Sequence, residues 1–186
     1  MRLIPGDRSL LVQTTKTFGS CADTPFTAGK RSQAPSMVVG MAIQRMDHVS
    51  VVVDDLEAAI GFFVELGMEV EGREPVEGPW VDDVCGLDGT RVEIAMMRTP
   101  DGHGKLELTS FRSPVAISPA PDNAVPNTLG LRSVMFAVDD VHDTVARLGA
   151  HGGELVGKVV EYADVYRLCY VRGPAGVIVS LAEELR

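Results

Sequence analysis

The sequence predicts an α+β fold made of two tandem βαβββ modules whose strands form a cupped mixed sheet. The first reason is an internal repeat: when the chain is shifted by 85 positions against itself, VDDL at 53–56 falls on VDDV at 138–141. The second is that each copy opens with an apolar strand that turns into an amphipathic helix. The third is that three strand-like segments follow each helix. Because the helix covers only one face of such a sheet, the other face has to be covered or to bind something.

The first module starts with a strand at 48–53 and a helix at 55–67. A carboxylate of the Asp-Asp pair between them can cap the free amides at the start of the helix, and Gly67 ends it. Three strands are expected after the helix, at 68–72, 90–98 and 104–111. The segment 78–89 lies between the first two of these strands and is expected to form a short helical turn and a loop.

The second module repeats this plan with a strand at 133–138 and a helix at 140–152. Its three further strands are expected at 153–160, 165–172 and 176–184. A linker that contains four prolines, 114–130, separates the modules. The predicted organisation is therefore a first module at 45–113, this linker, and a second module at 131–183, which together form one domain at 45–183.

Residues 1–40 differ from the rest of the chain. They lack a sustained hydrophobic period and are rich in Ser, Thr, Pro and Gly, so they are expected to be disordered. One interpretation is a start codon placed too far upstream, because strand patterning begins directly after Met41. The alternative is an organellar transit peptide, since the segment is basic, rich in Ser and poor in acids.

Composition and charge exclude several classes of function. The 186 residues carry a formal charge of −9, and because residues 1–40 hold five basic and two acidic side chains, the remainder carries −12. A body this acidic repels nucleic acid and favours a cationic ligand. No apolar run is long enough to span a membrane. Three widely spaced cysteines argue against a disulfide framework, so we expect a cytoplasmic protein that acts on a small molecule.

Alternation along the strands predicts which side chains face the cup, the open face of the sheet turned away from the helix. Alternate valines of the strand at 48–53 should pack under the helix, which turns His48 and Ser50 into the cup. The same rule turns Glu107 inward from the strand at 104–111. In the second module, the side chains expected in the cup are those of Ser133, Met135 and Ser180.

His48 and Glu107 are the main candidates for chemistry. An imidazole and a carboxylate on neighbouring strands make half of a divalent-metal site. Three interpretations stay open: a weakly held ion completed by water and substrate oxygens, a third ligand such as His103, or no metal and a pair arranged for proton transfer or for lining a ligand pocket. The alternative is a purely structural histidine, whose ring is hydrogen-bonded to a nearby carboxylate and takes no part in binding or catalysis.

Four further residues are weighed as substrate contacts. Arg91 lines the cup if its side of the strand at 90–98 faces inward, and a surface-facing ladder is an equal alternative. Arg167, if it faces inward, would grip a carboxylate or phosphate through its guanidinium. Trp80 would form a lid or a pocket wall, and Met135 lies on the predicted cup face.

Several stretches of the chain resemble the vicinal oxygen chelate superfamily. They are MDHVSVVVDDLEAAIGFFVELGMEV, LELTSF, FAVDDV and GPAGVIVSL. This superfamily includes glyoxalase I, methylmalonyl-CoA epimerase, extradiol dioxygenases, and the fosfomycin and bleomycin resistance proteins. The resemblance covers residues 45–183 and implies a glyoxalase-like fold. It leaves the reaction open, because this scaffold hosts many chemistries.

The resemblance also implies a divalent metal ion held by one residue from the first strand and one from the last strand of each module, usually His or Gln and Glu. His48 and Glu107 occupy the first two of these positions, whereas Ser133 and Ser180 occupy the other two. A serine hydroxyl is a poor ligand compared with imidazole or carboxylate, so an ion such as Mg, Mn, Ni, Zn or Fe is expected to be weakly held or absent.

Two functional hypotheses follow from the resemblance. The first is a lyase or isomerase similar to glyoxalase I or methylmalonyl-CoA epimerase, in which a metal stabilises an enediolate and Glu107 serves as ligand and base. The second is a metal-free protein that binds a small molecule such as an antibiotic, as bleomycin resistance proteins do. Since such modules pair within a chain or across a two-fold axis, a homodimer is expected.

Overall fold

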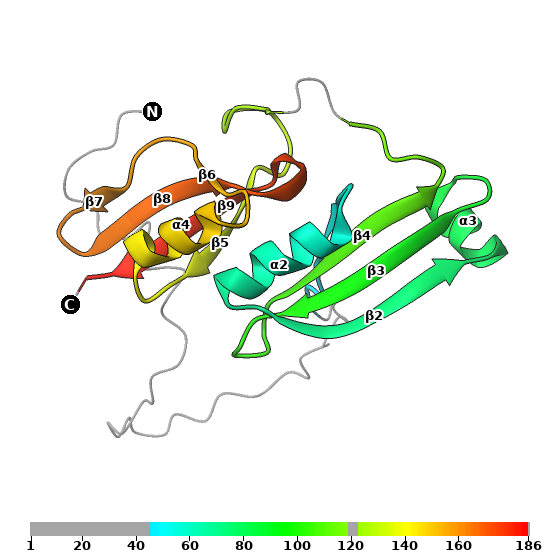
Figure 1. Cartoon of the computed structure of the whole chain (residues 1–186), viewed down its shortest axis with the longest axis horizontal. Helices are drawn as coiled ribbons and strands as arrows, with labels where there is room; N and C mark the ends of the chain where they lie inside the picture. The colour runs from blue at the N-terminus through cyan, green and yellow to red at the C-terminus, as the bar shows by residue number, and fades with distance from the viewer. Residues whose placement is uncertain (1–44, 119–122, 186) are drawn as a thin grey trace, which may run out of the picture. The chain divides into compact units, whose positions relative to one another are not determined.

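The computed structural model describes residues 45–118 and 123–185. The extension predicted at 1–40 lies outside these described residues. Figure 1 shows two modules in sequence order, each with a helix lying on one face of its own sheet. None of the helices in the described part of the chain is long and apolar enough to cross a membrane.

The first module is a four-stranded mixed sheet covered by one helix. Its strand order is β1-β4-β3-β2, with β1 parallel to β4 and the other neighbours antiparallel. The elements are β1 (Val49–Val52), α2 (Leu56–Leu66), β2 (Glu69–Glu77), α3 (Pro79–Cys85), β3 (Arg91–Arg98) and β4 (Lys105–Ser113). The short helix predicted within 78–89 is therefore present as α3.

The second module repeats this topology. Its strand order is β5-β9-β8-β6, with β7 also paired to β8, and β5 is parallel to β9. The elements are β5 (Ser133–Ala137), α4 (Val141–Gly149), β6 (Glu154–Leu155), β7 (Val160–Tyr162), β8 (Tyr166–Arg172), the short turn η1 (Pro174–Gly176) and β9 (Ile178–Glu184). The predicted α+β class with two tandem modules is confirmed, and each module forms its own mixed sheet.

Both main helices begin at the aspartates expected to cap them. The side chain of Asp55 accepts a hydrogen bond from the amide of Ala58 at 2.9 Å, and that of Asp140 accepts one from Asp143 at the same distance. Because this bond favours the ionised carboxylate, the pKa of Asp140 is lowered from its usual value. Gly67 ends α2 in the left-handed conformation, with φ 112°, that glycine adopts without strain.

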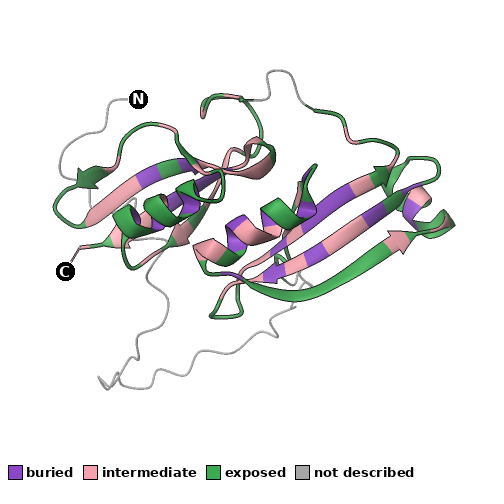
Figure 2. Cartoon of the chain, in the orientation of Figure 1, coloured by how far each residue is buried: buried purple, intermediate pink, exposed green. Residues whose placement is uncertain are grey.

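The core lies between the two helices and the sheet faces beneath them. Figure 2 shows buried residues on α2, on α4 and on the strands that they cover, whereas β2 is exposed along most of its length. On α2 the buried face includes Phe62 and Phe63, whose rings meet edge to face at 5.3 Å between centroids. Arg147 of α4 donates to the backbone oxygen and the carboxylate of Glu65 on α2, at 2.5 and 2.6 Å. The two modules share one core, because a single cluster of buried side chains includes Phe62 of α2 and Leu148 of α4.

Two strands differ from the sequence prediction. The strand expected at 68–72 continues to Glu77 through Pro75, which an edge strand tolerates because its missing amide is not needed for pairing. The strand expected at 153–160 is split into β6 and β7. Four residues, 156–159, stand between Leu155 and Val160, whereas only two residues of β8 separate their partners, so this segment leaves the sheet as a bulge.

Gly173 lies directly against the ring of Phe62. A Cβ atom at this position would meet the ring at 2.8 Å, and Phe62 is fully buried. The ring therefore has no free space into which it could move. The close approach of the chain before η1 to helix α2 requires a residue without a side chain here.

We expect Gly173→Ala to lower the free energy of unfolding by about 1–3 kcal/mol, because it overpacks the core at Phe62. The matched control is Gly149→Ala, since nothing lies within 4 Å of a Cβ at Gly149 and alanine favours a helix. Urea unfolding followed by circular dichroism measures both. Equal midpoints for the two variants would show that the ring does not need this gap.

Candidate functional site

The register of β1 and β4 decides which side chains share a face. Ser50 pairs with Glu107 and Val51 with Leu108. Leu108 is buried in the core and Val51 packs against it. Ser50 and Glu107 therefore lie on the opposite, open face, together with Thr109 two residues further along β4. The sequence-based assignment of this cup face in the first module agrees with these contacts.

His48 and Glu107 come together at this open face. His48 Nε2 lies 3.7 Å from Glu107 Oε2. The other carboxylate oxygen, Oε1, accepts hydrogen bonds from Ser50 Oγ at 2.9 Å and from Thr109 Oγ1 at 3.0 Å. The two hydroxyls fix one oxygen of Glu107, and the second oxygen is left facing the imidazole. The side chains of His48 and Glu107 are 34% and 22% exposed, so solvent and small molecules reach them.

Asp47 holds the other side of the imidazole. Its Oδ2 lies 3.1 Å from His48 Nδ1, and its Oδ1 accepts a hydrogen bond from Arg45. The bonds from Arg45 and His48 lower the pKa of the Asp47 carboxyl, with the Arg45 contact as the larger cause. A carboxylate on Nδ1 favours the tautomer whose proton is on that nitrogen, which leaves the lone pair of Nε2 toward the cup. The sequence analysis missed Asp47, although its place directly before His48 was a usable signal.

The second module has the same geometry but different side chains. In β5 and β9, Met135 pairs with Ser180, just as Ser50 pairs with Glu107, and Ser133 stands two residues before Met135, as His48 does before Ser50. The positions predicted from the resemblance are thus equivalent by register. One half of the duplicated site carries an imidazole and a carboxylate, and the other carries hydroxyls and a thioether.

Two cavities lie along these strands. One, of about 410 Å³, is lined by residues of β1 and β5, the edge strands of the two sheets, and includes Ser50 and Ser133. The other, of about 360 Å³, lies on the open face of the second sheet and includes Met135 and Ser180. His48 and Glu107 do not line either cavity; Ser50, which donates to Glu107, connects the pair to the first of them.

Arg167 does not face the cup, which corrects one expectation. It pairs with Glu183 in the register that places Cys169 opposite Leu181, and both of those residues are buried in the core. Arg167 is therefore on the helix side of β8. Its Nη1 donates to both carboxylate oxygens of Glu183 at 2.9 and 3.0 Å, and its Nη2 donates to Glu161 at 2.9 Å. The guanidinium is occupied by these two carboxylates.

Arg91 also lies away from the cup. Ala95 and Met97 on the same strand are fully buried in the core under α2. The irregularity between β3 and β4 falls beside Arg91 and leaves one extra residue in β4, so alternation along β3 is uninterrupted. Arg91 therefore points to the same side of the sheet as Ala95, and at the end of β3 this position is exposed. Of the two alternatives that the sequence left open, the structure favours the one in which Arg91 faces the surface.

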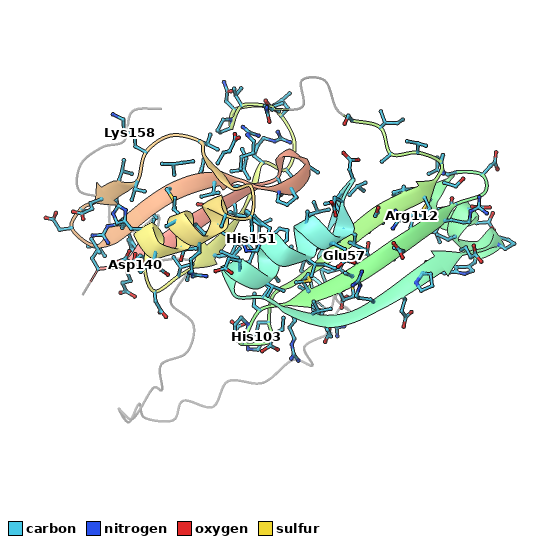
Figure 3. The ribbon with its side chains drawn as sticks, viewed as in Figure 1. Glu57, His103, Arg112, Asp140, His151 and Lys158 are labelled. Carbon is cyan, nitrogen blue, oxygen red and sulfur yellow. The ribbon has the colours of Figure 1, made fainter. Side chains whose placement is uncertain are left out.

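The remaining candidates have different outcomes. Met135 lines the cavity of the second sheet, and its role as a substrate contact stays a prediction. Trp80 is 61% exposed on α3 and lines none of the cavities described above. Figure 3 shows His103 in the turn between β3 and β4, where its amide donates to Asp101. Cys169 is buried, and burial raises the pKa of its thiol, which does not suit a nucleophile.

Of the cup residues described above, His48 and Glu107 are the two whose side chains suit a divalent ion. Within residues 45–118 and 123–185, no group of three or more His, Cys, Asp or Glu side chains is arranged to hold a metal. The imidazole Nε2 and the carboxylate Oε2 are strong donors, and the hydroxyls at the equivalent positions of the second module are weak ones. Any ion held here would take its remaining ligands from water or from substrate oxygens.

Two βαβββ modules that pair their first and last strands in the same register define a class of proteins with a duplicated fold, which hosts many functions. The family model described as Glyoxalase/Bleomycin resistance protein/Dioxygenase superfamily matches residues 45–181, and the chain belongs to this superfamily. Divalent metal ions are common in its members, and no particular metal is identified for this chain.

Solved structures similar to this chain include glyoxalase-family proteins. A glyoxalase family protein from Bacillus cereus is 50% identical, with a TM-score of 0.75, and the match covers 80% of this chain and 99% of that one. The trypanothione-dependent glyoxalase I of Leishmania major is 19% identical, with a TM-score of 0.53, over 76% of this chain and 88% of that one, which shows a shared fold. The comparison with curated proteins gives no match.

We expect Arg167→Gln to lower the midpoint of thermal unfolding. Removing the guanidinium leaves Glu183 without its main partner, and that carboxylate also accepts the amide of Val141 at the start of α4. Arg112→Gln is the control, because Arg112 forms an ion pair with Glu93 that is largely exposed and contributes little. Differential scanning fluorimetry compares the two variants. A smaller shift for Arg167→Gln than for Arg112→Gln would contradict a structural role.

Proposed function

We propose that the protein is a lyase or isomerase that moves a proton on a carbon next to a carbonyl group of a small molecule. The observation that supports this most directly is the approach of Glu107 Oε2 to His48 Nε2 on the open face of the first sheet. A carboxylate and an imidazole at this spacing form an acid–base pair, and proton transfer needs such groups to accept and donate the proton.

The proposed reaction uses Glu107 as the base. The carboxylate takes the proton from the α-carbon, the C–H bond breaks, and its electron pair moves into the carbonyl to give an enediolate oxygen. Return of the proton to the same carbon or to its neighbour completes an epimerisation or an isomerisation. His48, whose Nδ1 is held by Asp47, turns the lone pair of Nε2 to the cup, where it would accept the proton of a substrate hydroxyl.

Ser50 and Thr109 are proposed as positioning residues. Both donate to Oε1 of Glu107, so the carboxylate cannot rotate freely and Oε2 keeps its direction. A base held in the right orientation lowers the barrier, because the entropy of positioning it is lost before the reaction begins. The two hydroxyls come from the same two strands whose register brings His48 and Glu107 together.

A divalent ion, if the protein uses one, would be held by His48 and Glu107. When bound, such an ion supplies polarisation of two neighbouring substrate oxygens. The predicted set of Mg, Mn, Ni, Zn or Fe is not narrowed by these two donors, because imidazole and carboxylate together suit several of them.

We expect Glu107→Gln to abolish exchange of the α-proton with solvent while the fold is retained. The amide has the same shape but does not accept a proton at neutral pH. Exchange into D₂O, followed by proton NMR on a panel of α-hydroxy ketones and adducts of α-keto aldehydes with thiols, measures the activity. Glu154→Gln, an exposed change on β6, is the control. Equal exchange by both variants would rule out Glu107 as the base.

We expect Mn²⁺, Ni²⁺ or Zn²⁺ to raise the unfolding temperature of the native protein in proportion to the logarithm of its concentration, and His48→Ala to remove the effect. The reason is that an ion bound only to the folded state stabilises that state. His142→Ala, on the exposed side of α4, is the control for nonspecific binding. No shift with any of these ions would end the metal-dependent form of the proposal.

The second candidate function is a metal-free protein that binds and sequesters a small molecule. Its support is the second half of the cup, where a cavity of about 360 Å³ is lined by Met135 and by Ser180, which stands at the position of Glu107. A binding protein loses nothing when such ligands are replaced. Ligand binding without α-proton exchange on any substrate of the panel would favour this candidate over the enzyme.

Assembly and cellular location stay predictions. Members of the superfamily often form dimers, and light scattering on the full chain would test the predicted homodimer. The predicted cytoplasmic location rests on the cysteine pattern alone.

A further inference from the structure

The linings of the two cavities carry the same sign of charge. Among the residues that the structure describes, Lys158 is the one charged residue in the lining of the cavity on the second sheet. Within the same part of the chain, Arg132 is the one charged residue in the lining of the cavity at β1 and β5. Both are basic, although the protein as a whole carries a formal charge of −9. No acidic side chain of the described residues lines either cavity.

These two residues differ from most other basic residues of the described chain, which are neutralised by carboxylates. Neither Lys158 nor Arg132 forms a salt bridge within residues 45–118 and 123–185. Figure 3 shows Lys158 on the connection between β6 and β7. The ion pairs elsewhere include Arg73 with Glu57, Arg98 with Glu69, Lys105 with Glu71, and Arg147 with Glu65.

The floor of the second cavity is apolar and shaped by its strand register. Met135, Ser180 and Tyr170 form one row across β5, β9 and β8, with the small Ser180 in the middle. Met135 and Tyr170 are 55% and 41% exposed. Large apolar side chains that lie exposed next to one another often mark a binding surface. A small side chain between two large ones leaves a groove that suits a flat apolar group.

The bulge between β6 and β7 brings the charge to this floor. Residues 157–159 leave the ladder with β8, whereas the amide of Val156 still donates to Tyr170. This departure makes one wall of the cavity and places Lys158 in its lining. In a continuous strand at 153–160, successive side chains would instead have pointed to opposite faces of the sheet.

We propose that the cup binds a small anion with an apolar body, and that the substrate is a carboxylate of this kind. The apolar body lies on Met135 and Tyr170, and the anionic group is held by Lys158, the basic residue of the same cavity. Arg132 supplies the same sign of charge to the cavity at β1 and β5. The assignment of this ligand as the substrate rests on the proposed function. The cavity volume lies near the lower end of the range for small-molecule sites, about 300–1,000 Å³.

The overall charge of the chain favours the opposite sign of ligand, and the sequence alone predicts a cationic one. Charges on the exposed surface act on a bound ligand only weakly beyond about 10 Å in physiological salt, whereas a basic residue in the cavity wall acts at contact distance. The lining therefore decides the sign of the ligand, and the net charge affects only its rate of approach.

The test compares three probes of one shape and different charge: phenylpropionate, phenylpropanol and phenylpropylamine. Isothermal titration calorimetry with the full chain should show millimolar binding of the carboxylate and weaker binding of the alcohol and of the amine. Lys158→Gln together with Arg132→Gln should weaken the carboxylate by about threefold or more, the size of partly exposed charge contacts, and leave the alcohol unchanged. Arg91→Gln, an unpaired arginine outside both cavities, should change nothing.

Equal or tighter binding of the amine, no binding of any probe, or no effect of the double substitution would overturn the proposal. Glu107→Gln separates it from the proposed function. This variant should bind phenylpropionate as well as the native protein or better, because it removes a negative charge from the cup, while α-proton exchange is lost. Carboxylate binding that depends on Lys158 and Arg132, combined with exchange that does not depend on Glu107, would remove the proposed reaction and keep the anion site.

Discussion

The parallel pairing of the first strand with the last strand of each module is the constraint on which the rest of the structure depends. It places Ser50 opposite Glu107 in one module and Met135 opposite Ser180 in the other. A shift of one residue in either pairing would exchange the core face for the open face. The buried leucines of β4 prevent such a shift, because they must stay under α2. The stability of the core thus fixes the geometry of the candidate site.

Duplication supplies equivalent positions, and substitution has made them chemically unequal. The first module has an imidazole and a carboxylate supported by hydroxyls, the arrangement that we propose for proton transfer. The second has an apolar floor and a basic side chain on a bulge, the arrangement that we propose for ligand binding. The apolar surface and the charged pair lie on different sheets. The cup can therefore contain both without burying an unpaired charge against apolar side chains, which would be costly.

The sequence predicts those parts of the site where one strand face is clearly apolar. Valine alternates with His48 and Ser50 over residues 48–51, so the placement of His48 followed from period alone. On β3 and β8 both faces carry apolar side chains, and alternation could not say whether Arg91 and Arg167 point inward. Only their cross-strand partners decide it. The bulge with Lys158 was hidden for a different reason, since its extra residues appear only when paired against β8.

The sign of charge in the cup shows why net charge is a poor guide to a ligand. An acidic surface keeps a protein soluble. Several of the surface carboxylates here form ion pairs with arginine or lysine on the sheets and helices. The carboxylate of Glu107, the proposed base, lies on the first sheet. A carboxylate ligand keeps away from Glu107 if its anionic end is held on the second sheet. The division of the cup into two unlike halves would therefore make the proposed anionic substrate compatible with the proposed base.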